Sequence, residues 1–281
     1  MATEVGDVEA ASRLSGAIDA PETDRDGDLT DDAFLGGALA LLQMRSGYRA
    51  GLDAVMLAAA VAPAGDDALR VLDVGAGVGT AGLCVARRLP MAEVALLERE
   101  PELAELAARN IERNDLGLRV RAMAGSVGAA VADLRALGLA DESFSHVIAN
   151  PPYYDVSAGT VAPDRLKAGA HAMDGDGLER WARFMARMAR PLGVAVVVHR
   201  ADALPQLLQA FGQRFGAITI LPLHPREGEP ASRVLMRGVK GSRAPLRIMQ
   251  GFVLHGEGNA FTPEAQEILR NGGPLLPLMG K

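Results

Sequence analysis

Apolar and polar positions alternate along the chain in two kinds of block. Short, continuously apolar blocks predict seven buried strands, at residues 70–74, 93–97, 118–123, 144–149, 193–199, 218–221 and 234–239. Blocks with a helical apolar period lie before and between them and predict helices at residues 51–62, 80–89, 101–114, 178–189 and 204–215. Strands that alternate with helices over short connections form parallel sheets covered on both faces. We therefore expect an α/β fold with a doubly wound, mostly parallel, seven-stranded sheet.

The two ends of the chain differ from this central pattern. Residues 1–30 are acidic and lack a sustained apolar period, which predicts a disordered tail. Residues 31–69 are predicted to add a hairpin at 34–44 and the first helix to a catalytic domain that spans residues 70–255. Residues 256–281 are predicted to form a C-terminal helical extension, whose helix begins after Thr262.

Composition narrows the class of protein. The chain is 49% hydrophobic, but its apolar runs are too short to cross a membrane, and no signal peptide precedes them. These features predict a soluble, cytoplasmic protein. Cys84 is the single cysteine, so no disulfide can form within the chain, and we see no cluster of metal ligands.

Charge is distributed unevenly along the chain. The net charge is −6, yet residues 1–33 alone hold ten acidic residues against two arginines. Residues 160–281 hold sixteen Lys and Arg against ten acidic residues. The C-terminal half can therefore face a polyanion such as a nucleic acid.

The segment Asn150-Pro151-Pro152-Tyr153 directly follows the apolar run 144–149. Open α/β sheets bind ligands at the carboxyl ends of their strands, so chemistry is expected here. The two prolines stiffen the backbone and fix the direction of its carbonyls. Asn150 offers a side-chain carbonyl, Pro151 a backbone carbonyl and Tyr153 an aromatic face. Together they suit an exocyclic amine on an aromatic ring; a proline-stiffened turn with an exposed aromatic is the alternative.

Three glycines, Gly75, Gly77 and Gly79, follow the strand at 70–74 and precede the helix at 80–89. Glycines let the backbone approach a ligand closely, and the start of a helix presents unpaired N–H groups. Read from Gly77, the stretch also fits the dinucleotide pattern G-x-G-x-x-G. Asp73 argues against a dinucleotide, because its carboxylate would repel a pyrophosphate and attract the ammonium of an amino-acid ligand.

Other polar residues have both a functional and an ordinary interpretation. Glu98 ends the strand at 93–97, where an acid can accept hydrogen bonds from ribose hydroxyls or can simply be solvated. Asp53 can cap the helix at 51–62 or contact a ligand. His171 lies in a Gly-rich and Asp-rich segment and is either a surface residue or a catalyst.

The chain resembles the class I S-adenosylmethionine-dependent methyltransferases of the amino-methylating N-P-P-Y type, over most of residues 34–281. Within that class it looks like the bacterial tRNA(Val) adenine-N6 methyltransferases, which modify the adenine beside the anticodon. The stretches that carry the resemblance are GYRAGLDAVMLAAAV, VLDVGAGVGT, ANPPYYD, KAGAHAM and PLHPREGEPASRVLMRGVKGS. The resemblance implies a Rossmann-like methyltransferase fold, S-adenosyl-L-methionine as cofactor, and tRNA as substrate.

The resemblance also implies roles for single residues. Asp73 and the three glycines would hold the methionine part of the cofactor, Glu98 its ribose, and Asn150, Pro151 and Tyr153 the target base. One position departs from the pattern. Where such enzymes usually carry an acid for the adenine amine of the cofactor, this chain has Gly125-Ser126, and the Ser126 hydroxyl accepts such a bond more weakly.

Six basic residues follow one another near the last two strands: Arg226, Arg233, Arg237, Lys240, Arg243 and Arg247. We expect Arg237, Lys240 and Arg243 to contact RNA phosphates beside the N-P-P-Y pocket. Ion pairing with a nearby acid is the alternative for each, above all for Arg226.

Three other functions remain open. N-P-P-Y also occurs in enzymes that methylate a glutamine amide of peptide release factors. A nucleotide-dependent oxidoreductase would use the G-x-G-x-x-G pattern but would leave residues 150–153 without a role. A non-catalytic RNA-binding module with a degenerate cofactor site would account for Ser126.

Overall fold

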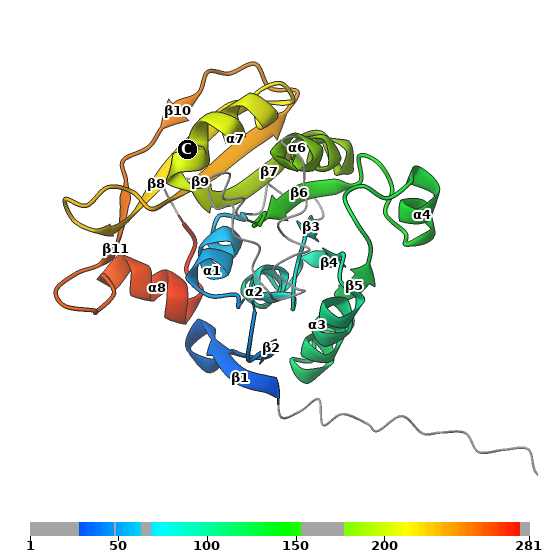
Figure 1. Ribbon diagram of the computed structural model, residues 1–281, viewed down its shortest axis with the longest axis horizontal. Helices are drawn as coiled ribbons and strands as arrows, with labels where there is room; N and C mark the ends of the chain where they lie inside the picture. The colour runs from blue at the N-terminus through cyan, green and yellow to red at the C-terminus, as the bar shows by residue number, and fades with distance from the viewer. Residues whose placement is uncertain (1–27, 48, 63–68, 153–176, 276–281) are drawn as a thin grey trace, which may run out of the picture.

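A single large sheet lies at the centre of the molecule (Figure 1). The computed structural model describes residues 28–47, 49–62, 69–152 and 177–275. The strands of the sheet are β3 (Arg70–Val74), β4 (Glu93–Glu98), β5 (Val120–Ala124), β6 (Phe144–Ala149), β7 (Ala189–Arg200), β8 (Phe215–Arg226), β9 (Arg233–Lys240), β10 (Arg247–Ile248) and β11 (Phe252–His255). Their order is β10-β8-β9-β7-β6-β3-β4-β5, and β11 also pairs with β8.

This sheet confirms the expected doubly wound α/β fold. Only β9 runs against its neighbours, β7 and β8, and the other pairs in the sheet are parallel. All seven predicted strands are present, and the short strands β10 and β11 extend the edge at β8. These two strands were not predicted, because β10 has only two residues and β11 only four, which is too short for a recognisable apolar pattern.

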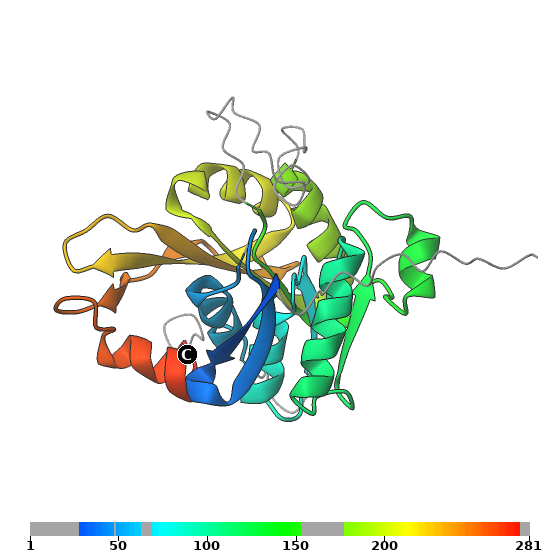
Figure 2. The ribbon, with the colours of Figure 1, turned by 60° about the horizontal axis from the view of Figure 1, so that its bottom comes forward.

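Helices cover both faces of the sheet (Figure 2). Their bounds are α1 (Leu52–Ala59), α2 (Thr80–Arg88), α3 (Pro101–Arg113), α4 (Val131–Ala136), α6 (Gly177–Met188), α7 (Leu204–Phe211) and α8 (Pro263–Asn271), with a 3-10 turn, η3, at Ala201–Ala203. Helices α1, α2, α3 and α8 contribute to one hydrophobic core, and α4, α6 and α7 to the other. The five helices predicted between residues 51 and 215 are present, but the last of them, α7, ends at Phe211, and residue 215 begins β8. The helix α4 was not predicted.

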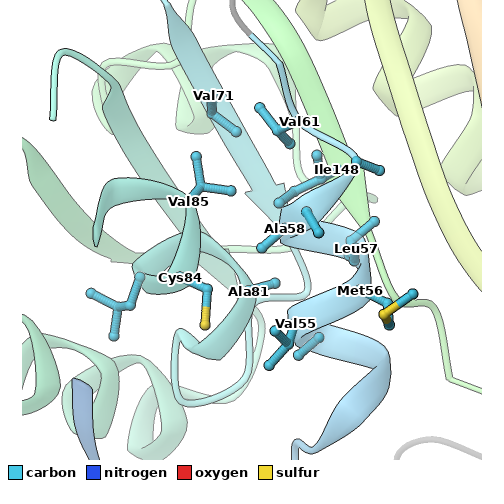
Figure 3. Close-up of a cluster of buried hydrophobic side chains, with 14 of the residues drawn as sticks. Val55, Met56, Leu57, Ala58, Val61, Val71, Ala81, Cys84, Val85 and Ile148 are labelled. Atoms are coloured by element: carbon cyan, nitrogen blue, oxygen red, sulfur yellow. The ribbon is translucent and has the colours of Figure 1, made fainter. Parts of the chain in front are cut away.

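The alternation of side chains along each strand builds the two cores. Val71 belongs to one core and its neighbour Leu72 to the other, because successive strand residues point to opposite faces. Figure 3 shows Val71 near Val85 of α2, and Ile148, from the adjacent strand, near Ala58 of α1. These contacts fix the helix that precedes the sheet against the helix that follows the glycines.

An antiparallel hairpin precedes the sheet and corrects one prediction. Its strands are β1 (Leu29–Phe34) and β2 (Leu39–Met44), joined by the 3-10 turn η2 (Leu35–Gly37). The sequence analysis began the hairpin at residue 34 and assigned residues up to 30 to the tail. It missed β1 because the acids in it resemble the tail, whereas Asp31 and Asp32 pair with Arg113 and Arg49. Residues 1–27 of the predicted tail lie outside the described part.

The C-terminal helix α8 packs against α1 and η2. As expected, the helix begins after Thr262, whose hydroxyl oxygen accepts a hydrogen bond from the N–H of Ala265 at 3.2 Å. The N-terminal and C-terminal segments therefore meet on one face of the sheet. Within the described residues, no helix is long and apolar enough to cross a membrane.

Candidate functional site

The predicted site residues follow the carboxyl ends of four adjacent strands. In the pairing of β3 with β6, Val74 lies opposite Ala149, so Gly75 and Asn150 leave the sheet side by side. In the pairing of β4 with β5, Glu98 lies opposite Ala124, and Ser126 follows Ala124 by two residues. The strand order thus places Asn150, the glycine loop (residues 75–79), Glu98 and Ser126 in a row along one edge.

The three glycines of this loop adopt left-handed backbone conformations. Their φ angles are 66° at Gly75, 57° at Gly77 and 89° at Gly79. A Cβ atom at Gly75 would lie 2.5 Å from Cη2 of Trp181, and one at Gly79 would lie 2.9 Å from Cδ1 of Leu96. A Cβ atom placed on Gly77 would have no described atom within 4 Å. The loop therefore packs on the protein at both ends and is open in the middle, where a ligand can approach its backbone.

Glu98 is coupled to this open part of the loop. Its carboxylate accepts hydrogen bonds from the N–H of Gly77 at 2.7 Å and from the N–H of Glu100 at 3.0 Å, and the residue is buried. A carboxylate has about four lone-pair sites, so two N–H donors leave acceptor capacity for hydroxyl groups. This position suits the predicted contact with a ribose.

Asp73 lies behind the loop rather than in its open part. The residue is 2% exposed, and Oδ2 accepts a hydrogen bond from the N–H of Gly82 at 2.8 Å. Burial raises the pKa of its carboxyl from 3.8 to about 7; the Gly82 hydrogen bond opposes this shift, and the charge of Glu98 adds to it. Asp73 therefore supports the start of α2, and a direct contact with the cofactor stays a prediction.

The segment after β5 is held against the end of β4. The N–H of Gly125 donates to the carbonyl of Glu98 at 2.7 Å, and the Ser126 hydroxyl oxygen accepts a hydrogen bond from the N–H of Gly128 at 3.2 Å. A hydroxyl oxygen that has accepted one bond still has a second lone pair. Recognition of the cofactor adenine at Ser126 stays a prediction.

The structure describes only part of the N-P-P-Y segment. Pro151 is buried, and Asn150 and Pro152 are half-buried, at the end of β6. Tyr153 and His171 lie outside the described residues, so their predicted contacts with the substrate stay predictions. Within the described residues, no group of three or more His, Cys, Asp or Glu is placed to hold a metal ion.

Comparison with known proteins identifies the family. Residues 53–178 match the model of the methyltransferase small domain. A crystal structure from Agrobacterium tumefaciens, described as a predicted O-methyltransferase, is 36% identical, has a TM-score of 0.65, and matches over 79% of this chain and 96% of its own. The chain belongs to the S-adenosylmethionine-dependent methyltransferases.

Two curated relatives of this methyltransferase act on different substrates. A tRNA1(Val) (adenine(37)-N6)-methyltransferase from Flavobacteriaceae bacterium (strain 3519-10) is 33% identical over 41% of this chain. A release factor glutamine methyltransferase from Gloeobacter violaceus is 30% identical over 53% of it. The chain spans about half the length of these relatives, 46% and 52% respectively.

The cofactor of this methyltransferase is S-adenosyl-L-methionine. The site fits it: the open backbone at Gly77 can approach the cofactor, and Glu98 beside it can accept from the ribose. Asp73, buried behind the loop, also fits a sulfonium cofactor better than a dinucleotide, because its negative charge would repel a pyrophosphate. The oxidoreductase alternative is wrong, because the chain belongs to a family that uses S-adenosyl-L-methionine.

The structure corrects the interpretation of Asp53 as the cap of the first helix. The residue before α1 is Gly51, and Asp53 lies inside the first turn, so it does not cap the helix. Its Oδ2 instead lies 3.0 Å from Nε of Arg233, at the start of β9. This ion pair ties α1 to the sheet at the edge where Asn150 lies.

The positions of Lys240 and Arg243 contradict the prediction that they lie beside the N-P-P-Y segment. Because β9 runs against β7, Lys240 lies at the amino ends of the parallel strands, where its Nζ is 2.8 Å from Oε1 of Glu142. Arg243 follows it at that same edge and is exposed. Arg237 is half-buried within β9, and burial lowers the pKa of its guanidinium. Lys240 and Arg243 therefore do not lie beside Asn150. The six residues of β6 separate the two ends of the sheet by about 20 Å, at about 3.3 Å per residue.

The alternative given for Arg226, an ion pair with a nearby acid, is confirmed: its Nε lies 3.9 Å from Oε1 of Glu229. Its guanidinium also donates to the carbonyl of Gly256 at 3.1 Å and to Oδ1 of Asn259 at 3.1 Å. Arg226 thus holds the turn before α8.

Trp181 and Asn110 are parts of the site that sequence analysis missed. Trp181 of α6 packs its ring against Gly75, and it is the only tryptophan in the chain. Asn110 of α3 donates to the carbonyl of Val78 inside the glycine loop. A single tryptophan at an apolar helix position is a signal that could have been noticed, whereas an asparagine in a helix carries none.

The pKa of Asp73 gives a test of its contact with the cofactor. Near pH 7 a carboxyl with a pKa of about 7 is about half protonated, and a cofactor ammonium beside it would lower that pKa. Binding should then release up to about half a proton, and affinity should rise with pH through that range. The measurement is calorimetric titration with the cofactor in two buffers of different ionisation enthalpy. Asp73→Asn is the control, because it keeps an acceptor for Gly82 but cannot release a proton; equal heats in both buffers for the wild type would limit Asp73 to supporting the loop.

Proposed function

We propose that this methyltransferase transfers the methyl group of S-adenosylmethionine to the exocyclic amine of an adenine in RNA, in tRNA(Val) beside the anticodon. The observation that supports it most is the pairing of Val74 with Ala149, which sets the N-P-P segment directly beside the glycine loop. A methyl donor held by the loop and an amine held by the segment would then be neighbours. The tRNA methyltransferase among the relatives favours adenine as the acceptor.

The electronics of the substrate explain why such a segment is needed. The lone pair of an adenine amine is delocalised into the ring, so the nitrogen is a poor nucleophile. The side-chain oxygen of Asn150 and the carbonyl of Pro151 would accept its two N–H groups, which favours positive charge on the nitrogen and aims its lone pair at the donor. The cofactor, when bound, supplies an electrophilic methyl group on a sulfonium.

The proposed reaction needs no strong base. His199 lies on β7, the strand beside β6, but burial lowers the pKa of its imidazole to about 4. A base of that pKa takes up protons poorly at neutral pH. The proton that the methylated amine loses would therefore pass to water, while Asn150 and Pro151 hold the nitrogen in place.

A second candidate function is methylation of a glutamine amide in a release factor. The same two acceptors would hold an amide –NH2, and one relative bears that activity. Among the described residues before the glycine loop, the hairpin β1–β2 packs against α2 and α3, and α1 packs against β6 and β7. The helical substrate domain that release-factor enzymes of the N-P-P-Y type usually carry before the loop is not among these described residues.

Transfer of a labelled methyl group distinguishes the candidate functions and tests Asn150. The protein is incubated with methyl-labelled cofactor and either unmodified tRNA(Val) or purified release factors, and digested nucleosides are analysed by mass spectrometry. We expect label in N6-methyladenine. Asn150→Ala should lower the turnover number at least about 100-fold with little change in cofactor affinity, as for loss of a preorganised polar contact.

Asn150→Asp is the matched control for that variant, because it retains an acceptor oxygen at the same place and should lose less activity. Label in the release factor would support the second candidate, and label in neither substrate would support the non-catalytic module. Near-normal turnover by Asn150→Ala would contradict the role of its side-chain oxygen.

Arginines at the carboxyl ends of the parallel strands offer a different surface for RNA from the one predicted from sequence. Arg200 ends β7 and lies opposite Arg233 of β9, close to the strand that carries Asn150. Arg200 pairs with the exposed Asp202, and exposed ion pairs contribute only about 0–1 kcal/mol, so a phosphate can compete for the arginine.

Salt dependence tests this surface. If Arg200 contacts a phosphate, Arg200→Ala should flatten the dependence of log affinity on log salt by about 0.7 for single-stranded RNA. The measurement is filter binding of a tRNA anticodon stem-loop across a salt series. Lys240→Ala, which removes the same charge at the opposite edge, should leave the slope unchanged; the reverse pattern would restore the original prediction.

A further inference from the structure

Two asparagines close the free edge of the N-terminal hairpin: Asn110 in α3 and Asn114, the residue that directly follows the helix. One edge of β2 pairs with β1, and the other faces α3. Asn110 accepts from the N–H of Leu42 at 2.8 Å and donates to its carbonyl at 3.0 Å. Asn114 does the same with Ala40, at 3.0 Å and 2.9 Å.

The spacing of the two asparagines matches that of the strand. Four residues along a helix rise roughly 6.0 Å, and two residues along a strand rise roughly 6.6 Å. Side chains at positions i and i+4 of α3 can therefore bond alternate residues of β2, as a neighbouring strand would. Both asparagines are buried, 0% and 6% exposed, and hold β2 in the same way.

The two asparagines differ in one bond. Nδ2 of Asn110 also donates to the carbonyl of Val78 at 3.0 Å, whereas Nδ2 of Asn114 makes its additional bond to the carbonyl of Asn110 within α3, at 2.8 Å. Asn110 thus joins the hairpin, α3 and the glycine loop through a single amide group.

The bond to Val78 acts on the part of the loop that a ligand meets. Val78 lies between Gly77 and Gly79, two residues in left-handed conformations that have no Cβ atom to restrict their backbone. The carbonyl of Val78 and the N–H of Gly79 share one planar peptide unit. The N–H of Gly79 donates to the carbonyl of Ala76 at 2.9 Å inside the loop, so Asn110 supplies the bond that ties this unit to the rest of the protein. Glu98 holds the N–H of Gly77 from the side of the sheet, and Asn110 holds the carbonyl of Val78 from the side of α3.

We infer that Asn110 is a positioning residue for the cofactor: it preorganises the glycine loop and couples cofactor affinity to the docking of the N-terminal hairpin. A loop that is already ordered loses less conformational entropy when the cofactor binds. The alternative is that Asn110, like Asn114, only fastens the hairpin. The two residues therefore form a natural pair for a test.

The test compares Asn110→Leu with Asn114→Leu; each variant removes an equivalent pair of bonds to β2, at Leu42 and at Ala40 respectively. Both variants should lower the melting temperature. Only Asn110→Leu should also weaken the binding of S-adenosylmethionine and S-adenosylhomocysteine, by about tenfold for the loss of one buried hydrogen bond, against less than about threefold for Asn114→Leu. Calorimetric titration measures the affinity, and no RNA substrate is needed, so the result is independent of which substrate the enzyme methylates.

Amide hydrogen exchange gives a second readout on the protein without cofactor. The amides of Gly77 and Gly79 should exchange faster in Asn110→Leu than in Asn114→Leu, because only the first variant releases the loop. If Asn110→Leu does not fold, Asn110→Asp keeps the acceptor for Leu42 and removes only the donor to the two carbonyls; it should show the same loss of affinity. Equal effects of the two asparagine variants on affinity, or no effect of either, would overturn the inference.

Discussion

The parallel pairing of β3 with β6 is the constraint on which the site depends. The chain turns to one side of β3 to form β4 and β5, and to the other side to form β6 and β7, so β3 and β6 flank the point where the strand order reverses. Open α/β sheets bind their ligands at such points. Because Val74 and Ala149 are neighbours there, the loop that holds the cofactor and the segment that faces the acceptor begin side by side. The proposed transfer of a methyl group requires that proximity.

The electrostatics of this edge favour a cationic cofactor. Asp73 and Glu98 are both buried beside the glycine loop, and each accepts a backbone N–H from it or from the helix that follows. Burial, and to a smaller extent the charge of Glu98, raises the pKa of Asp73 to about 7, so the pair carries less negative charge near pH 7 than two exposed acids would. A positively charged ligand would relieve that repulsion, whereas a pyrophosphate would add to it.

How far the sequence predicts this structure depends on the range of each interaction. The strands β3 to β9, the five helices predicted between them and before them, and the glycine loop follow from local apolar patterns and backbone requirements, and these were predicted. The strands β1, β10 and β11 and the helix α4 were not, because their apolar patterns are short or interrupted by charged residues. The partners of charged residues depend on contacts between distant segments: Lys240 meets Glu142, and Asp53 meets Arg233. The direction of β9 decides at which edge Lys240 lies, and its apolar pattern is the same in either direction. Asn110 was missed for a related reason, because its role requires β2, α3 and the loop to be in contact.

The most direct test of this account is a crystal structure of the protein with S-adenosylhomocysteine, which lacks only the transferred methyl group. The account predicts that the ribose hydroxyls lie within hydrogen-bond distance of Glu98. It also predicts that the backbone of Gly77 borders the ligand and that the sulfur faces Asn150 at the end of β6. A ligand bound elsewhere, or a sulfur turned away from Asn150 with the N-P-P segment out of reach, would contradict it.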